Sequence, residues 1–314
     1  MNLAVSPAVE VQVRTSENTG GREKRVFVHA ENYAQSFWVN PKKPSRFPHP
    51  LLQHIIARMP LPEHLRVNIR LFSPVPAGIS TGTSASVCVA LLGALSFLKK
   101  RRLAIRELVS LAHRIETQDL KQQSGIQDQI CAASGGICFI HMHRYPRARV
   151  ENIKLRPKTW NELGRRICLI YLGRPHLSSA IHERVIAELE RKGPEWRTLE
   201  RMKQLPARAK AFLLEGDLDS YGEVMRENNE CQRSLFSKLI SREADAVIAV
   251  AQKHGASGWK VNGAGGQGGS LTILANPDDG VRRKMLQAIA ALGKGIRPLP
   301  VSLSATGLEA WEIE

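Results

Sequence analysis

A loop of small residues that leads directly into an apolar helix is the strongest chemical signal in the sequence. The segment PVPAGISTGTSASVCVALLGAL covers residues 74–95. Gly78 and Gly82 permit close backbone approach to a ligand and backbone conformations with positive φ. The first N–H groups of a helix lack intrahelical partners, and the helix dipole attracts anions to that end. The segment therefore predicts a phosphate-binding loop.

Side-chain hydroxyls crowd the same loop. Five of the seven residues from 80 to 86 carry one, whereas a helix cap requires a single hydroxyl. Anion binding is accordingly favoured over a simple capped helix after a proline turn. No Gly-Lys-Ser/Thr sequence follows, so the loop is not a Walker A motif. The residues that we predict to bind the phosphates are Pro76, Gly78, Ser80, Gly82, Thr83, Ser84 and Ser86.

Two acidic residues beyond this loop could complete a phosphoryl-transfer site. Glu116 ends an amphipathic helical segment, and Asp128 lies in the sequence SGIQDQ. Phosphoryl transfer needs a divalent metal to neutralise the phosphates and a group that orients or deprotonates the attacking hydroxyl. A carboxylate and a serine hydroxyl can hold Mg²⁺, which needs few protein ligands. The alternative for this pair is a solvent-exposed Glu at a helix end and an Asp that caps the next helix.

A glycine-rich turn near the C-terminus is the third signal. Five glycines fall within residues 263–269, between two apolar strands. A plain hairpin turn needs one or two, so the excess predicts backbone packed against a ligand or another loop. A flexible hairpin is the alternative. We assign Gly263, Gly265 and Gly266 to support of the substrate or of a loop.

Three weaker candidates complete the list of chemical residues. Gly125, in SGIQDQ, is assigned to support of the substrate or of a loop. Ser178 can cap a helix that begins after Arg174, and contact of both residues with an anionic substrate is equally open. No metal site is expected in the segment CFIHMH, because strand alternation places Cys138 and His141 on opposite faces.

The elements that must position these residues follow from hydrophobic periodicity. Alternating or β-branched runs predict strands at 8–15, 25–30, 36–40 and 65–73. Helical spacing predicts helices at 49–59, 84–98, 104–116 and 282–293, and mostly helix from 178 to 253. A strand, a glycine loop and a strand span 259–274, and a last strand lies near 298–304. A polar, irregular stretch at 155–165 suggests a domain boundary.

Length and composition limit the class of protein. The chain of 314 residues suits two domains of roughly 150 residues each. Its five cysteines are scattered and form no C-x-x-C pair, which favours reduced thiols in the cytoplasm. No apolar run is long enough to span a membrane, and we expect no signal peptide. The net charge of +16 favours anionic ligands such as phosphorylated metabolites.

With these three motifs in this order, the chain resembles the GHMP kinases, the superfamily of galactokinase, homoserine kinase and mevalonate kinase. The loop PAGISTGTSAS is similar to the family's phosphate loop, with Ser80 in place of a glycine and Thr83 in place of the first serine. The resemblance implies that Asp128 is the catalytic aspartate and that Ser84 and Glu116 bind Mg²⁺. NGAGGQGGS is similar to the family's C-terminal glycine motif.

The resemblance also implies a fold and an activity. The fold is α+β in two domains: an N-terminal ATP-binding domain (1–160), like ribosomal protein S5 domain 2, and a ferredoxin-like C-terminal domain (161–314). The segments QSGIQDQICAASGG and LGRPHLSSAIHE are most similar to the sugar-kinase branch, which includes heptose 7-phosphate kinase and fucokinase-like enzymes. We therefore expect an ATP- and Mg²⁺-dependent cytoplasmic kinase that phosphorylates a hydroxyl of a sugar or sugar phosphate.

The beginning of the chain departs from the family pattern. Family members open with a strand that carries a basic residue and a sugar-binding Gly-Gly-x-x-Asp segment. This chain begins at Met1 with NLAVSPAVEVQV, which resembles the strand after that segment. We expect a truncated start or a catalytically weak nucleotide- or sugar-binding protein. Nucleic-acid binding is a third alternative, motivated by charge alone, and a homodimer stays an open alternative.

Overall fold

A computed structural model describes residues 1–19, 24–44, 48–76, 78–175, 183, 185–187, 189–191, 196–263 and 265–313. The chain divides into two compact units. The unit that we call N-terminal comprises Asn2–Ala77, Gly82–Val150 and Ser304–Glu314. The C-terminal unit comprises Met1, Gly78–Thr81 and Glu151–Leu303.

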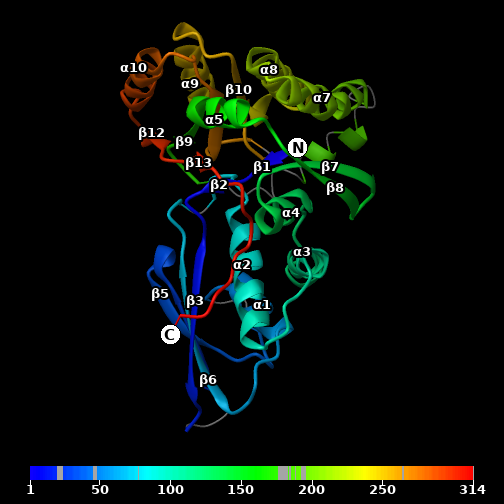
Figure 1. Ribbon diagram of the computed structural model, residues 1–314, viewed down its shortest axis with the longest axis vertical. Helices are drawn as coiled ribbons and strands as arrows, with labels where there is room; N and C mark the ends of the chain where they lie inside the picture. Colours follow the sequence, from blue (N-terminus) through cyan, green and yellow to red (C-terminus); the bar gives the residue numbers. More distant parts are fainter. Residues whose placement is uncertain are drawn as a thin grey trace. The chain divides into compact units, whose positions relative to one another are not determined.

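A four-stranded sheet forms one layer of the N-terminal unit (Figure 1). Its order is β3 (Glu10–Glu17), β6 (Leu65–Phe72), β4 (Val26–Ala30) and β5 (Gln35–Val39). β6 pairs antiparallel with β3 and parallel with β4. The predicted alternation is confirmed in β6, where Val67, Ile69 and Leu71 are buried and the residues between them are exposed.

Helices cover the apolar face of this sheet. α1 (Pro50–Arg58) and α2 (Thr83–Leu98) contribute to one core cluster with β4, β5 and β6. Figure 1 shows both helices beside the strands. α2 is apolar almost all round, as expected for a helix surrounded by other elements, and its residues Leu91, Leu92 and Leu95 are fully buried.

A helical segment of this unit changes geometry near its end. α3 (Ile105–Arg114) begins with the side chain of Glu107 accepting from the Ala104 amide. After α3 the chain continues as one π-helical turn, Ile115–Asp119. The predicted helix over 104–116 is thus correct in place, but its last turn is wider than an α-helix. Such π turns are rare and occur often at functional sites.

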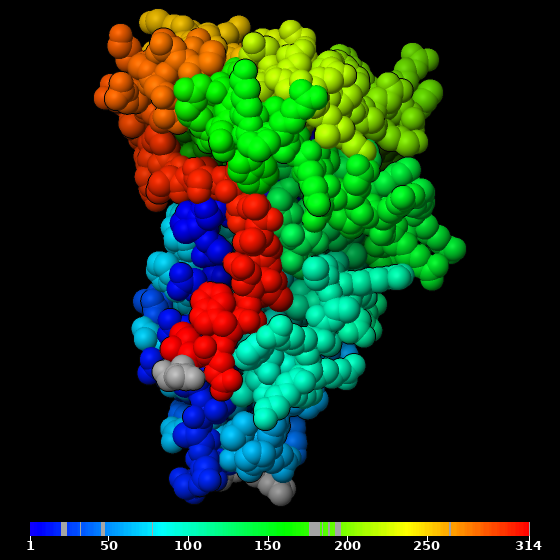
Figure 2. Space-filling view, viewed as in Figure 1, coloured from blue at the N-terminus to red at the C-terminus, as the bar shows by residue number. Residues whose placement is uncertain are grey.

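A second, smaller sheet has the order β1 (Asn2–Leu3), β7 (Ile137–Arg144) and β8 (Arg147–Ile153). α4 (Gln127–Ser134) leads into β7, and the chain passes from the N-terminal to the C-terminal unit within β8. The residues after Ser304 return to the N-terminal unit as an irregular tail, which forms a red band on the face drawn in Figure 2. This tail is held by backbone bonds from Gly136 N to Ser304 O and from Leu308 N to Ala133 O.

The C-terminal unit contains a four-stranded antiparallel sheet in the order β10 (Gly258–Val261), β11 (Ser270–Leu274), β9 (Ile167–Leu172) and β12 (Ile296–Leu299). β9 and β11, the first and third of these strands along the chain, are central, and β10 and β12 are at the edges, which is the ferredoxin-like arrangement. α9 (Arg242–Lys253) and α10 (Asp279–Ala290) share a core cluster with β9 and β11. The α+β fold expected from the sequence is confirmed.

The remaining elements of the C-terminal unit are mostly helical. α5 (Pro157–Arg166) precedes β9, and α7 (Trp196–Glu215) packs beside α8 (Leu218–Leu235). α8 packs directly on β10. The packing is so close that a Cβ at Gly222 would come within 2.5 Å of the Ser257 carbonyl oxygen.

The short elements are β2 (Val5–Ser6), the 3-10 turns Glu31–Tyr33 and Ser237–Leu239, and β13 (Ser302–Leu303). Within the described ranges no helix is long and apolar enough to cross a membrane.

Candidate functional site

The loop that we predict to bind phosphate ends where α2 begins. Gly82 is the N-cap of α2 and has a φ of +70°, so Thr83 and Ser84 are the first two helical residues. A Cβ at Gly82 would lie 3.1 Å from the Cβ of Asp128. Glycine is therefore required here for two reasons: its backbone has a positive φ, and Asp128 leaves no room for a Cβ. Ser86 continues the first turn of the helix, where its amide donates to the Gly82 carbonyl at 2.9 Å.

Glu116 is the centre of a buried hydrogen-bond cluster. Its side chain is 3% exposed, although it belongs to the polar end of an amphipathic helix. Ser84 Oγ donates to Glu116 Oε1 at 2.8 Å. Ser124 Oγ and Gln129 Nε2 donate to Glu116 Oε2 at 2.7 and 2.6 Å. The alternative of a helix-terminal Glu in solvent is wrong, because the π turn directs this carboxylate into the unit.

The cluster fits a divalent cation by the chemistry of its donor set. A carboxylate and a serine hydroxyl are the hard oxygen ligands that Mg²⁺ prefers. Three neutral donors surround the carboxylate, and no cationic side chain bonds to it in the described residues. Gln129 Oε1 is also buried and lacks a hydrogen-bond partner within the same part of the chain. A water molecule on a bound Mg²⁺ is a donor of the kind that this oxygen needs.

No larger metal cluster competes with this assignment. Among the described residues, no group of three or more His, Cys, Asp or Glu side chains could hold a metal ion. In the segment CFIHMH, Cys138 is buried and donates to the Gly135 carbonyl, whereas His141 and His143 are exposed with ring centroids 4.1 Å apart.

Asp128 lies on α4, beside the start of α2. It is the second residue of α4, and the N-cap is Ile126, so the alternative of Asp128 as the cap of this helix is wrong. Asn2 Nδ2 donates to Asp128 Oδ1 at 3.0 Å. Gly82, Ser84, Glu116 and Asp128 thus belong to one region of the N-terminal unit.

The earlier residues of the loop belong to the C-terminal unit, where they pack against the glycine turn. Ser270 Oγ donates to the Ile79 carbonyl oxygen at 2.6 Å. A Cβ at Gly263 would lie 3.1 Å from the Cβ of Ser80. Ser80 itself has a φ of +61°, a conformation that suits the glycine of the family pattern better than a serine.

Contacts with Leu239 and Arg174 also fix the glycine turn. A Cβ at Gly265 would come within 2.2 Å of the Leu239 carbonyl oxygen, which also accepts from the Gly266 amide at 2.7 Å. The Gly269 amide donates to the Arg174 carbonyl at 2.9 Å, and the Arg174 guanidinium bonds to Glu243 at 2.9 Å. These contacts correspond to backbone packed against other loops rather than to a loose hairpin.

The other predicted site residues have plainer surroundings. The Gly125 carbonyl oxygen lies 3.1 Å from Ser124 Oγ. Pro76 is half-buried, and Ser178 lies outside the described residues. Sequence reasoning missed Asn2, Ser124 and Gln129. Ser124 and Gln129 flank Asp128 in the motif, so their proximity in the sequence was an available signal, whereas Asn2 gave none.

Burial changes the acidity of two groups near the cluster. Desolvation lowers the pKa of His113, although the Ser124 carbonyl and the Glu116 charge act in the opposite direction. Burial also raises the pKa of the Cys88 thiol well above its usual value, and the charge of Glu116 adds to this effect. Both groups are therefore neutral near pH 7.

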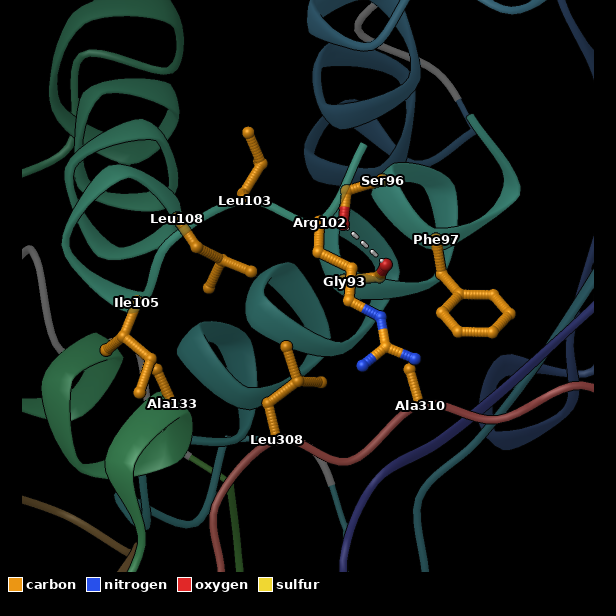
Figure 3. A pocket seen from close by; sticks show the side chains of 10 residues that line it. All are labelled: Gly93, Ser96, Phe97, Arg102, Leu103, Ile105, Leu108, Ala133, Leu308 and Ala310. Carbon is orange, nitrogen blue, oxygen red and sulfur yellow. Dashed lines mark hydrogen bonds between the residues drawn. The ribbon is translucent and has the colours of Figure 1, made fainter. Parts of the chain in front are cut away.

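An apolar pocket lies at the other end of α2. Gly93 is ten residues beyond Thr83, roughly 15 Å along the helix axis. The pocket has a volume of about 170 Å³, and Figure 3 shows Leu108 and Leu308 directed into it from α3 and the tail. Its lining is mostly apolar, so it does not suit phosphates. The lining residues are Gly93, Ser96, Phe97, Arg102, Leu103, Ile105, Leu108, Ala133, Leu308 and Ala310.

Comparison with known proteins agrees with these motifs. The family model of the GHMP kinases N terminal domain matches residues 51–136, and that of the GHMP kinases C terminal matches residues 209–294. The first match contains the loop, Glu116 and Asp128. The second contains the glycine turn.

The relatives and the solved structure described next are all named kinases. The D-glycero-alpha-D-manno-heptose 7-phosphate kinase of Campylobacter jejuni is 25% identical over 253 residues, which cover 79% of this chain and 72% of the relative. The mevalonate kinase of Pyrococcus horikoshii is 28% identical over 257 residues, covering 79% and 69%. The Lactococcus lactis galactokinase structure has a TM-score of 0.71 at 16% identity and covers 96% of this chain and 86% of that one, which is a likeness of fold.

Proposed function

Because the chain belongs to the GHMP kinase family, we propose that it transfers the γ-phosphoryl group of ATP to a hydroxyl of a sugar or sugar phosphate. Its relatives are named kinases, and the chain is a phosphotransferase with an alcohol acceptor. The proposal concerns the identity of that acceptor, the metal and the roles of individual residues.

The buried Glu116 cluster is the observation that supports the assignment of roles most strongly. Ser84 and Glu116 would hold Mg²⁺, and the N-terminus of α2 would bind the phosphates. When bound, Mg²⁺ neutralises charge on the transferring phosphoryl group. Ser124 and Gln129 keep Oε2 of Glu116 engaged, which leaves Oε1, the oxygen that faces Ser84, for the metal.

Asp128 is the residue proposed to act on the acceptor. Asp128 lies beside the start of α2, and its carboxylate would accept the proton of the attacking hydroxyl. Asn2 fixes one carboxylate oxygen by its hydrogen bond, so that Asp128 is held in one orientation. Most of the acceleration would come from positioning and charge neutralisation rather than from proton transfer.

A heptose 7-phosphate is the acceptor that we favour. The heptose 7-phosphate kinase of Campylobacter jejuni is among the relatives, and the net charge of +16 suits a phosphorylated acceptor as well as ATP. Mevalonate is the second candidate, because several archaeal mevalonate kinases match at 26–29% identity. Five buried free cysteines favour a reducing compartment, and we place the enzyme in the cytoplasm on that basis.

A panel of acceptors tests the proposal. ATP and Mg²⁺ would be incubated with the protein and heptose 7-phosphate, fucose, galactose or mevalonate, and the product phosphate ester would be quantified. The proposal expects turnover with a sugar or sugar phosphate. Preference for mevalonate would replace the sugar assignment. ATP binding without transfer to any acceptor would support the weak nucleotide-binding alternative instead.

A further inference from the structure

The tip of the β7–β8 hairpin contacts the loop that contains Ser124, one of the residues that hydrogen-bond to Glu116. Tyr145 follows β7, and its hydroxyl donates to the Ser124 carbonyl oxygen at 2.9 Å. The same hydroxyl lies 2.7 Å from Nε2 of His113. The two rings also make an edge-to-face contact with centroids 5.4 Å apart.

The hydrogen-bond inventory of these groups fixes the direction of each bond. A tyrosine hydroxyl has one proton, and a backbone carbonyl can only accept. The proton of Tyr145 therefore goes to Ser124, and His113 Nε2–H donates to the tyrosine oxygen. His113 is 4% exposed, and burial lowers its pKa, so it makes this bond as a neutral imidazole near pH 7.

These bonds join the two segments on either side of Glu116. His113 precedes Glu116 by three residues on the end of α3, and Ser124 follows it by eight residues in an irregular loop. Ser124 Oγ is one of the two donors to Glu116 Oε2. The tyrosine thus closes the loop between them and restricts the positions that Ser124 can take.

We propose that Tyr145 is a positioning residue that sets metal affinity by holding Ser124, and through Ser124 the Glu116 carboxylate, in the metal-binding orientation. The proposal rests on the proposed function, because it requires Glu116 to be a metal ligand. Tyr145 contacts His113 and Ser124, so its effect on Glu116 is indirect. Tyr145 lies at the tip of the hairpin and belongs to none of the three sequence motifs.

The test is the affinity for Mn²⁺ in the presence of a non-hydrolysable ATP analogue, measured by electron paramagnetic resonance. Tyr145→Phe keeps the ring and removes both hydroxyl bonds. One or two hydrogen bonds of ordinary strength predict that the Mn²⁺ dissociation constant rises about three- to tenfold. Tyr33→Phe is the matched control, since Tyr33 is also part-exposed and also packs its ring on a histidine, His49. It should leave the affinity unchanged.

A double-mutant cycle separates positioning from a general structural effect. In Ser124→Ala the link to Glu116 is absent, so adding Tyr145→Phe should change the Mn²⁺ affinity by less than about 1.5-fold. Saturating Mg²⁺ should restore the kcat of Tyr145→Phe, which a distorted fold would not allow. Unchanged Mn²⁺ affinity in Tyr145→Phe, or fully additive effects, would overturn the inference. Absence of Mn²⁺ binding in the wild-type protein would instead overturn the metal assignment of the proposed function.

Discussion

Replacing Glu116 by glutamine separates its role in metal binding from its role in folding. The carboxylate is 3% exposed and receives three donors at 2.6–2.8 Å. A glutamine oxygen can accept from Ser124 and Gln129, and its NH₂ group can donate to Ser84 after the hydroxyl rotates. All three contacts survive, although each loses the extra strength of a bond to a charged group.

The magnitudes follow from these contacts. A hydrogen bond to a charged acceptor stabilises the fold by roughly 1 kcal/mol more than a bond to a neutral one. Removing a buried charge also removes its desolvation penalty of several kcal/mol, which stabilises the folded state. The two terms largely cancel, so the free energy of unfolding of Glu116→Gln should stay within about 1 kcal/mol of the wild type. Loss of one charged group that stabilises the transferring phosphoryl group should lower kcat/KM about 10²- to 10³-fold.

Two measurements on the same sample decide the matter. Urea denaturation gives the free energy of unfolding, and a Mg²⁺ titration of the ATPase or kinase rate gives the metal dependence. Glu107→Gln on α3 is the matched control, because Glu107 is exposed and accepts from the Ala104 amide at the helix start. The reasoning is refuted if Glu116→Gln keeps a rate within threefold of the wild type, or if it loses several kcal/mol of stability.

Three further predictions concern other parts of the N-terminal unit. Gly135→Ala should lower the free energy of unfolding by about 2 kcal/mol or more, because Gly135 has a φ of +70° and its Cβ would lie 2.1 Å from the Thr306 carbonyl carbon. Gly136→Ala, where the nearest atom is 3.7 Å away, should cost less in the same denaturant titration. Asn2→Ala should reduce kcat several-fold without weakening ATP binding, because it frees one oxygen of Asp128; a change in the KM for ATP alone would contradict this. Burial lowers the pKa of His113 in the folded state, so the unfolded chain binds a proton at higher pH than the folded chain does. The free energy of unfolding should therefore fall as the pH drops below about 6.5. His113→Gln should reduce this dependence on pH, and an unchanged dependence would speak against the prediction.

Parts of the fold could be predicted from local sequence patterns because burial leaves a mark on the order of apolar and polar residues. Strand alternation gave β6, and an apolar sequence gave α2. The ferredoxin-like order of the C-terminal unit followed from the family resemblance rather than from periodicity. The ends of elements were less predictable: nothing in the local sequence distinguishes the π turn after α3 from another α-helical turn.

The candidate site was predictable only where its residues lie in motifs. Ser84, Glu116 and Asp128 are in segments with recognisable spacing, and their roles remain predictions. The bond between Asn2 and Asp128 joins residues 126 positions apart, and the bond between Tyr145 and Ser124 joins two loops. Such contacts depend on how sheets and helices pack, which hydrophobic periodicity does not specify.

Phosphoryl transfer by the wild type and by Asp128→Asn is the most direct test of the central claim. Transfer of labelled γ-phosphate to heptose 7-phosphate would be measured together with ATP affinity for both proteins. The proposed role of Asp128 predicts that the substitution lowers kcat at least about 100-fold and leaves ATP affinity within twofold. A kcat for Asp128→Asn close to that of the wild type would contradict the account.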